Sequence, residues 1–207
     1  MAVLKYREDI DALRGISVFL VVIFHFFPEA LPGGFVGVDV FFVISGFIIT
    51  NLINTEIDQK EFFLARFYAR RIKRLFPSLI FVFAFVIIFG WLFLYQDEFL
   101  LLGNHLYASV FFYQNISLIE EIGYFDVGAH YKQLLHFWSL SIEEQYYIFW
   151  PILLVLLRKF LISPAIVLLP VFFCSFLYLV YSSNEIDSGA FFHSLSRVWE
   201  LSLGSLL

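Results

Sequence analysis

Long apolar runs recur along the 207-residue chain, and they constrain its fold more than any other feature. Hydrophobic side chains make up 61% of the residues, far more than in an average soluble domain. A run of about 20 apolar residues can cross a bilayer as a helix that satisfies its own backbone hydrogen bonds. The sequence therefore predicts an all-α fold, a polytopic transmembrane helix bundle with about five full spans. These runs are 11–27, 36–53, 78–95, 139–157 and 161–181.

A sixth apolar run begins near residue 198 and is shorter than the others. It supplies only about ten residues before Leu207, whereas about 20 are needed to cross. No long polar segment indicates a separate soluble domain. We therefore expect a single membrane domain over 1–207 that is incomplete at its C-terminus, with a truncated sixth span.

The positions of the cations predict how the bundle is oriented. The chain's one basic cluster lies between the second and third runs, and short loops rich in Lys and Arg stay in the cytoplasm. Two spans precede this loop, so the N-terminus is expected in the cytoplasm as well. The pair Arg158-Lys159 marks the same side. The cluster consists of Lys60, Arg66, Arg70, Arg71, Lys73 and Arg74.

The stretch 99–119 is apolar enough to resemble a further span, but it is also rich in polar residues. A full crossing here would move Arg158-Lys159 to the wrong side of the membrane. We therefore predict a re-entrant or interfacial segment, with its polar groups buried in protein or lining a wet cavity. Those polar residues are Asn104, His105, Ser109, Gln114 and Asn115.

Two ionisable residues share the first apolar run. Arg14 and His25 are eleven residues apart, about 1100° of helical rotation, so they share one face roughly 16 Å apart. Ionisable groups inside a membrane usually face a bundle interior or a wet cavity and mark a functional site. We expect both side chains to line one aqueous cleft. The alternative is that Arg14 snorkels to the lipid headgroups and His25 caps the far end of the helix.

Five motifs follow one another along the chain, and their order and spacing resemble those of a known family. They are DALRG (11–15) through His25, GVDVFFVISGF (37–47), Arg71-x-x-Arg74 with Pro77, HFWSLSIEEQYY (136–147), and SRVWEL (196–201) with Gly204. Together they resemble acyltransferase family three, the bacterial membrane O-acetylases of surface polysaccharides. The hallmark of that family is Arg or Lys, ten residues and then His, which Arg14 and His25 match.

The resemblance implies a multi-pass O-acyltransferase of the bacterial inner membrane. It would move an acyl group, expected to be acetyl, from acetyl-CoA or another acyl-CoA to a hydroxyl of a cell-surface glycan such as lipopolysaccharide. His25 would be the general base, because a neutral imidazole can accept a hydroxyl proton. Arg14 and Glu144 would complete the catalytic set. Acyl-CoA would be a co-substrate, so we expect no bound cofactor and no metal, and membrane lipid rather than nucleic acid as a partner.

Three arginines of the basic cluster belong to or flank the family's R-x-x-R motif. Arg71 and Arg74 resemble a site for the phosphates of the acyl donor, with Arg70 beside them. Arg14 is expected to contribute as well, because a guanidinium offers paired donors to a phosphate. The alternative is a juxtamembrane helix on anionic lipid, with Arg66, Arg70 and Arg74 in one cationic stripe.

A further set of polar and aromatic residues in the motifs is expected to line the cavity or to contact the acceptor. Glu143 and Glu144 are adjacent and point about 100° apart on a helix, so at most one should face the interior. Which of the two does so stays open. The set consists of Asp39, Ser45, Trp138, Ser141, Glu143, Arg197 and Glu200.

Several of these residues also have structural interpretations. Ser45 with Gly46 forms a small notch that favours helix packing. Asp39 either has a structural role or orients His25. Arg197 and Glu200 are three residues apart, so they could simply pair with each other.

A carrier or channel is the competing interpretation of the whole chain. Ionisable residues within spans also line paths for solutes or protons, and Arg14 and His25 could do so here. Composition alone does not separate the two classes. The chain has no evident inverted repeat, which a transporter would favour.

Overall fold

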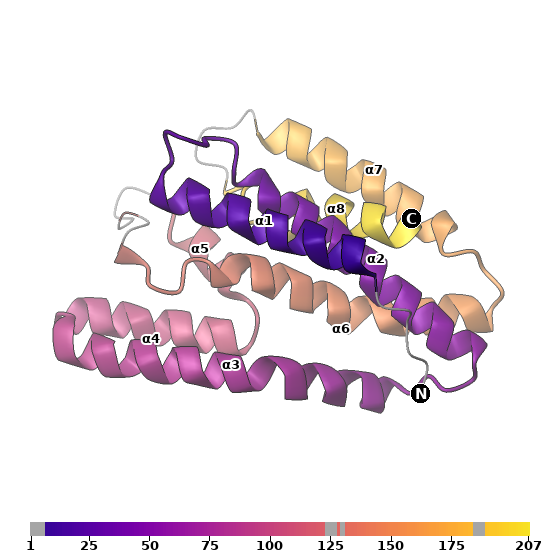
Figure 1. The fold of residues 1–207 in the computed structure, drawn as a ribbon, viewed down its shortest axis with the longest axis horizontal. Coiled ribbons are helices and arrows are strands. Elements are labelled where there is room, and N and C mark those ends of the chain that lie inside the picture. The colour runs from indigo at the N-terminus through magenta and orange to yellow at the C-terminus, as the bar shows by residue number, and fades with distance from the viewer. Residues whose placement is uncertain (1–6, 123–127, 129–130, 184–188) are drawn as a thin grey trace.

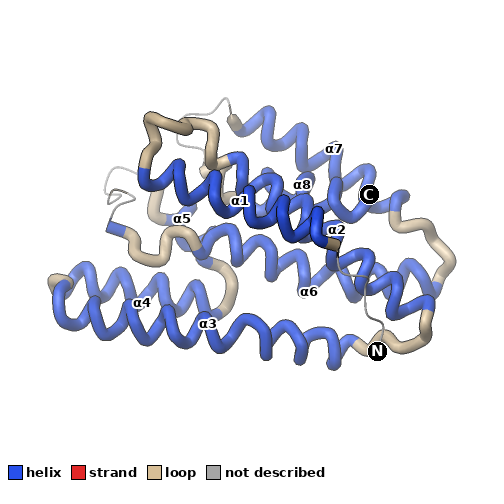
Figure 2. Tube along the Cα trace, viewed as in Figure 1, coloured by secondary structure: helices blue, strands red, loops and turns tan. Residues whose placement is uncertain are grey.

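The computed structural model describes residues 7–122, 128, 131–183 and 189–207, and its regular elements over these residues are all helices (Figures 1 and 2). This confirms the predicted all-α class. The helices are α1 (Glu8–Phe26), α2 (Val36–Asp58), α3 (Leu64–Phe93), α4 (Gln96–Val110), α5 (Gln114–Glu120), α6 (Phe137–Lys159), α7 (Ala165–Ser182) and α8 (Ser194–Leu206).

The long helices run side by side, so that the ends of several helices meet at each end of the bundle (Figure 1). At one end α1, α3 and α7 begin, and α2 and α6 finish. The basic residues of α3 and the pair Arg158-Lys159 therefore lie at the same end. The connection from α1 to α2 lies at the opposite end.

Within the described ranges, four helices are long and apolar enough to cross a membrane: α2, α3, α6 and α7. The predicted first span is also a helix, but α1 carries Glu8, Asp9, Asp11 and Arg14 in its first two turns and falls outside this group. The prediction of five apolar spans therefore becomes four spans plus the more polar α1.

The stretch 99–119 forms parts of two short helices, α4 and α5, joined by a turn in which Phe112 has a positive φ of 55°. The longer one, α4, has 15 residues and extends about 22 Å, short of a bilayer core of about 30 Å. As expected, most of the polar groups of this stretch are buried in protein. The four with no exposed surface are His105, Ser109, Gln114 and Asn115.

Most of the basic cluster is helical, as the juxtamembrane-helix alternative expects, and only Lys60 lies in the connection before α3. α3 begins at Leu64, so the arginines lie in its first three turns, and Pro77 lies inside the helix rather than at its start. The residues of this segment include Leu, Ala and Arg, which are strong helix formers. The connection from α2 is therefore only 59–63. The arginines gain fixed directions because they stand on a helix.

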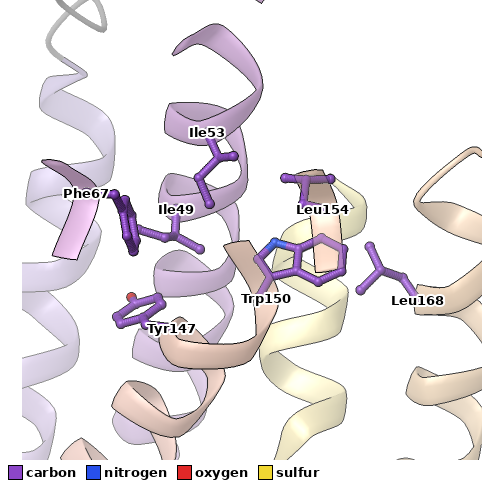
Figure 3. Close-up of a cluster of buried hydrophobic side chains, with 7 residues drawn as sticks. All are labelled: Ile49, Ile53, Phe67, Tyr147, Trp150, Leu154 and Leu168. Atoms are coloured by element: carbon purple, nitrogen blue, oxygen red, sulfur yellow. The ribbon is translucent and has the colours of Figure 1, made fainter. Parts of the chain in front are cut away.

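The core of the bundle joins α2, α3, α6 and α7. Figure 3 shows the side chains that meet there, with Trp150 at the centre. Trp150 is 3% exposed, and its ring Nε1–H donates to Thr50 Oγ1 at 2.7 Å, so the one polar atom of the ring has a partner. The cluster consists of Ile49, Ile53, Phe67, Tyr147, Trp150, Leu154 and Leu168.

Two glycines allow the backbones of α2 and α8 to touch. A Cβ on Gly46 would lie well inside contact distance of the Leu201 carbonyl oxygen, and one on Gly204 would collide with the Val43 carbonyl oxygen. Small residues permit such close approach between membrane helices. Gly46 of the Ser45-Gly46 notch therefore serves helix packing, as one of the two interpretations expected.

Replacing Gly204 with alanine is therefore expected to lower the free energy of unfolding by about 1–3 kcal/mol, because the added methyl group must push two backbones apart. The measurement is unfolding by SDS in mixed micelles. The matched control is Gly103→Ala in α4, where nothing lies within 4 Å of the new Cβ. There the free energy of unfolding should rise by about 0.5–1 kcal/mol, because alanine is the better helix former. Equal effects of the two changes would contradict the close contact.

Candidate active site

A cavity of about 420 Å³ lies between α1, α2, α3 and α6. Its walls are mostly apolar, with valines from α1 and phenylalanines from α2. The polar groups in it are few, and several are charged, as is typical of sites for small molecules. The charged and hydroxyl-bearing lining residues are Arg14, Ser17, Ser45, Arg71, Arg74, Ser139, Glu143 and Tyr147.

One stripe of α1 faces this cavity. Arg14, Ser17, Val18 and Val21 all line it, at the spacing of a single helix face. The Arg14 guanidinium lies over the ring of Phe41, 5.2 Å from its centroid. Its side chain is 30% exposed, and its carboxylate neighbour on α1 is 4.0 Å away. Arg14 therefore presents a weakly neutralised cation to the cavity.

His25 continues the same stripe beyond Val21, at the opposite end of α1. It is exposed and is not among the residues that line the cavity. The expectation that Arg14 and His25 line one cleft is therefore met for Arg14 and not for His25. The Nδ1 of His25 lies 2.7 Å from the Val21 carbonyl oxygen. Because a carbonyl only accepts, Nδ1 must carry the hydrogen and Nε2 holds the free lone pair of the neutral ring.

A second histidine meets His25, and sequence reasoning did not assign it a role. The rings of His25 and His136 are edge to face, with centroids 4.4 Å apart. Desolvation and the neighbouring His25 lower the pKa of His136 below its ordinary value, so His136 stays neutral to more acidic pH. The available signal was its place as the first residue of the HFWSLS motif, directly before α6.

Glu143 is the carboxylate that faces the cavity. It accepts a hydrogen bond from the Ser45 hydroxyl at 2.6 Å and another from the Tyr147 hydroxyl at 2.6 Å. Glu143 and Tyr147 are one turn apart on α6, so the same helix face carries both. The predicted cavity position of Ser45 and Glu143 is thus present in the structure.

Glu144 points about 100° away from Glu143 and pairs with Arg71 of α3. Both guanidinium and carboxylate are largely buried, with Arg71 Nε 3.4 Å from one Glu144 oxygen and a second, shorter contact to the other. The Arg71 guanidinium also stacks on Tyr147, 3.7 Å from the ring centroid. Glu144 therefore holds Arg71 at the cavity wall, and its expected place in the catalytic set stays a prediction.

The other two arginines of the predicted donor site have different environments. Arg70 donates to both carboxylate oxygens of Glu56, at 2.7 and 2.9 Å, and so ties α3 to α2. Arg74 lines the cavity and is exposed, and among the residues the structure describes it forms no ion pair. The arginines of the predicted cationic stripe, Arg66, Arg70 and Arg74, therefore do not share one environment: Arg70 pairs with Glu56, and Arg74 lines the cavity.

The remaining predicted residues lie apart from the cavity. Arg197 bonds Asp39 at 2.9 Å and Glu200 at 3.2 Å, and its guanidinium lies 5.6 Å from the Trp138 ring centroid. Asp39 thus pairs with α8 instead of orienting His25, and the expected pairing of Arg197 with Glu200 occurs. Ser141 is 1% exposed, and its hydroxyl accepts from a backbone N–H of α5 at 3.3 Å. None of these five residues lines the cavity.

These features define a class: a multi-pass helical membrane protein with an arginine-lined cavity and a pair of histidines at the far end of one cavity-lining helix. The sequence profile of a family described as an acyltransferase domain matches residues 7–206. The chain belongs to this acyltransferase family, which confirms the resemblance of its motifs.

Several curated proteins are similar to the chain over most of its length. A candidate O-acetyltransferase of Staphylococcus aureus (strain MSSA476) is 35% identical over 99% of the chain and 35% of its own length. The candidate membrane-bound transacylase BcsY of Komagataeibacter xylinus is 38% identical over 97% of the chain and 50% of its own length. Peptidoglycan O-acetyltransferase OatA of Listeria monocytogenes is 35% identical over 79% of the chain and 26% of its own length.

The chain thus spans between about a quarter and a half of the length of these relatives. No solved structure matches the chain.

Proposed function

We propose that the chain carries the donor site and the base of a membrane O-acyltransferase. The enzyme would transfer an acyl group, expected to be acetyl, from acyl-CoA to a hydroxyl of a cell-surface glycan such as a lipopolysaccharide. The observation that carries this proposal is the shared face of α1, where Arg14 lines the cavity and the free Nε2 of His25 stands at the far end. Family membership and the names of the relatives support it.

The donor would bind through its phosphates at the arginine-lined end of the cavity. Arg14 faces it with one carboxylate, Asp11, 4.0 Å away, and Arg74 faces it with no ion pair among the described residues. Arg71 lines it as well, paired with Glu144. A guanidinium group can donate two parallel hydrogen bonds to the oxygens of one phosphate. This interaction is stronger where water is partly excluded. Arg70 is assigned a structural role here, because both of its contacts are to Glu56.

The chemical step would begin at Nε2 of His25. This nitrogen takes the proton of the glycan hydroxyl while the hydroxyl oxygen attacks the thioester carbonyl carbon. The carbon–sulfur bond then breaks, and the imidazolium returns its proton to the departing thiolate, which gives the ester and free CoA. An acyl-histidine intermediate would use the same lone pair and release the same products.

The arrangement of charge supports an inner-membrane protein with a cytoplasmic N-terminus. The arginines of α3 and the pair Arg158-Lys159 lie at one end of the bundle, as the positive-inside rule favours for the cytoplasmic side. Acyl-CoA would enter there. His25 would then stand toward the other face, where a glycan acceptor is expected.

The test is transfer of label in proteoliposomes that contain the protein at its full natural length, radiolabelled acetyl-CoA and a bacterial surface glycan. We expect label in an alkali-labile ester on the glycan, and loss of that label when the glycan hydroxyls are blocked. A carrier would move its solute unchanged. Uptake of intact acetyl-CoA or glycan without ester formation would therefore reject the proposal in favour of transport.

A further inference from the structure

Two adjoining hollows lie where α2 ends and where α6 turns toward α7, away from the arginine-lined cavity. Their volumes are about 360 and 590 Å³, within the range of small-molecule sites. Ile57 and Arg158 line both hollows, so the two adjoin each other, and together they are called the groove here. Spans α2 and α6 both terminate beside the groove (Figure 1), so we expect it to lie at a membrane–water boundary.

Three cations line this groove: Lys60, Arg158 and Lys159. Arg158 is held in place by Asn54, which accepts hydrogen bonds at 2.9 and 3.3 Å, and it faces one carboxylate, Asp58, at 3.7 Å. In the described part of the chain neither lysine forms an ion pair. The residues that line the groove therefore include three positive charges and no carboxylate, an excess that favours an anion.

The edge of the groove is apolar and outward-facing. Leu161 lines the second hollow and is 94% exposed, and Phe160 beside it is 65% exposed. Leu161 has a positive φ of 57°, which ends α6 and turns the chain out of the helix. An apolar patch directly next to cations is typical of surfaces that contact lipid at the headgroup level.

We infer that this groove binds an anionic phospholipid, with the phosphate of its headgroup at Lys60, Arg158 and Lys159. The acyl chains would lie against Leu161 and Phe160. Basic pockets between transmembrane helices bind such headgroups through the same combination of charge and apolar contact. A free phosphate ion would satisfy the cations but would leave the apolar edge uncovered, so the lipid is the ligand favoured by both halves of the groove.

The test is titration of the detergent-solubilised protein with phosphatidylglycerol, with bound lipid counted by native mass spectrometry. The double substitution Lys60→Gln/Lys159→Gln should lower the affinity about tenfold or more, because each lysine near a phosphate contributes to binding. Arg158 is left in place, since it also contacts Asn54. The matched control Arg66→Gln/Lys73→Gln removes two exposed cations of α3 outside the groove and should change the affinity less than twofold.

Three further measurements separate the lipid from other anions and from misfolding. Phosphatidylcholine should bind at least tenfold more weakly, and inorganic phosphate should not displace phosphatidylglycerol. Leu161→Asn is an exposed substitution that leaves every cation in place. It should weaken the binding of phosphatidylglycerol and leave the binding of inorganic phosphate unchanged. Unchanged affinity in the lysine double variant, an equal loss in the α3 control, or displacement by phosphate would each overturn the inference.

Discussion

Replacing His25 with alanine is expected to reduce acyl transfer by about 10²–10⁴-fold, the usual contribution of a positioned general base. In His25, Nδ1 donates to the Val21 carbonyl and Nε2 carries the lone pair that accepts the proton. Alanine has no side-chain nitrogen, so the substitution removes this base. The measurement is acetyl transfer from labelled acetyl-CoA to glycan in membranes that contain the protein at its full natural length. The amount of protein in the membrane should not change, because His25 is exposed.

The control for this prediction is His193→Ala. His193 lies before α8, and its ring accepts a hydrogen bond from the Leu195 backbone N–H, so its loss removes a helix cap but no part of the His25–His136 pair. Transfer by this variant should stay within about twofold of the unaltered protein when corrected for the amount of protein. Activity retained in His25→Ala would remove the general-base role.

Replacing Arg71 with methionine is expected to lower the free energy of unfolding by about 3–5 kcal/mol. The Arg71 and Glu144 side chains are 17% and 9% exposed, so the substitution leaves a carboxylate largely buried without its cation. Removing both charges with Arg71→Met/Glu144→Leu should recover most of that loss, because two apolar side chains then fill the site. SDS unfolding in mixed micelles measures all three proteins.

The matched control is Arg66→Met, on the same helix. Arg66 is exposed and lies over the Phe63 ring, 5.1 Å from its centroid, so its removal should cost less than about 1 kcal/mol. If Arg71→Met proved as mild as Arg66→Met, the Arg71–Glu144 pair would not hold α3 against α6. A double variant no more stable than Arg71→Met would show that lost packing of Arg71, rather than the unpaired carboxylate, sets the cost.

The fold was largely predictable, because apolar runs of helical length leave few alternatives in a membrane. The start of α3 was less predictable. The predicted apolar run begins at residue 78, yet the helix begins at Leu64, because the residues before Pro77 are good helix formers. Charge indicates which side of a membrane a segment occupies, and it does not indicate whether the backbone there is helical.

The site was predictable only in part, because the rotation of each helix about its axis depends on tertiary packing. Glu143 faces the cavity and Glu144 faces Arg71. The sequence alone does not determine which of these two adjacent glutamates faces the cavity. The approach of His136 to His25 joins segments 111 residues apart. Single-helix periodicity placed Arg14 and His25 on one stripe of α1, but it could not show that the cavity reaches Arg14 and not His25, because the partner helices set its extent.

The backbone contact between Gly46 and α8 has a consequence for the interpretation of inactive variants. Ser45, the residue directly before that contact, donates its hydroxyl to Glu143 on the cavity wall. A bulky residue anywhere along this seam would tilt α2 and separate the two oxygens without touching any reacting group. A screen for loss of activity would then recover seam positions together with chemical ones, and only a folding assay run alongside would sort them.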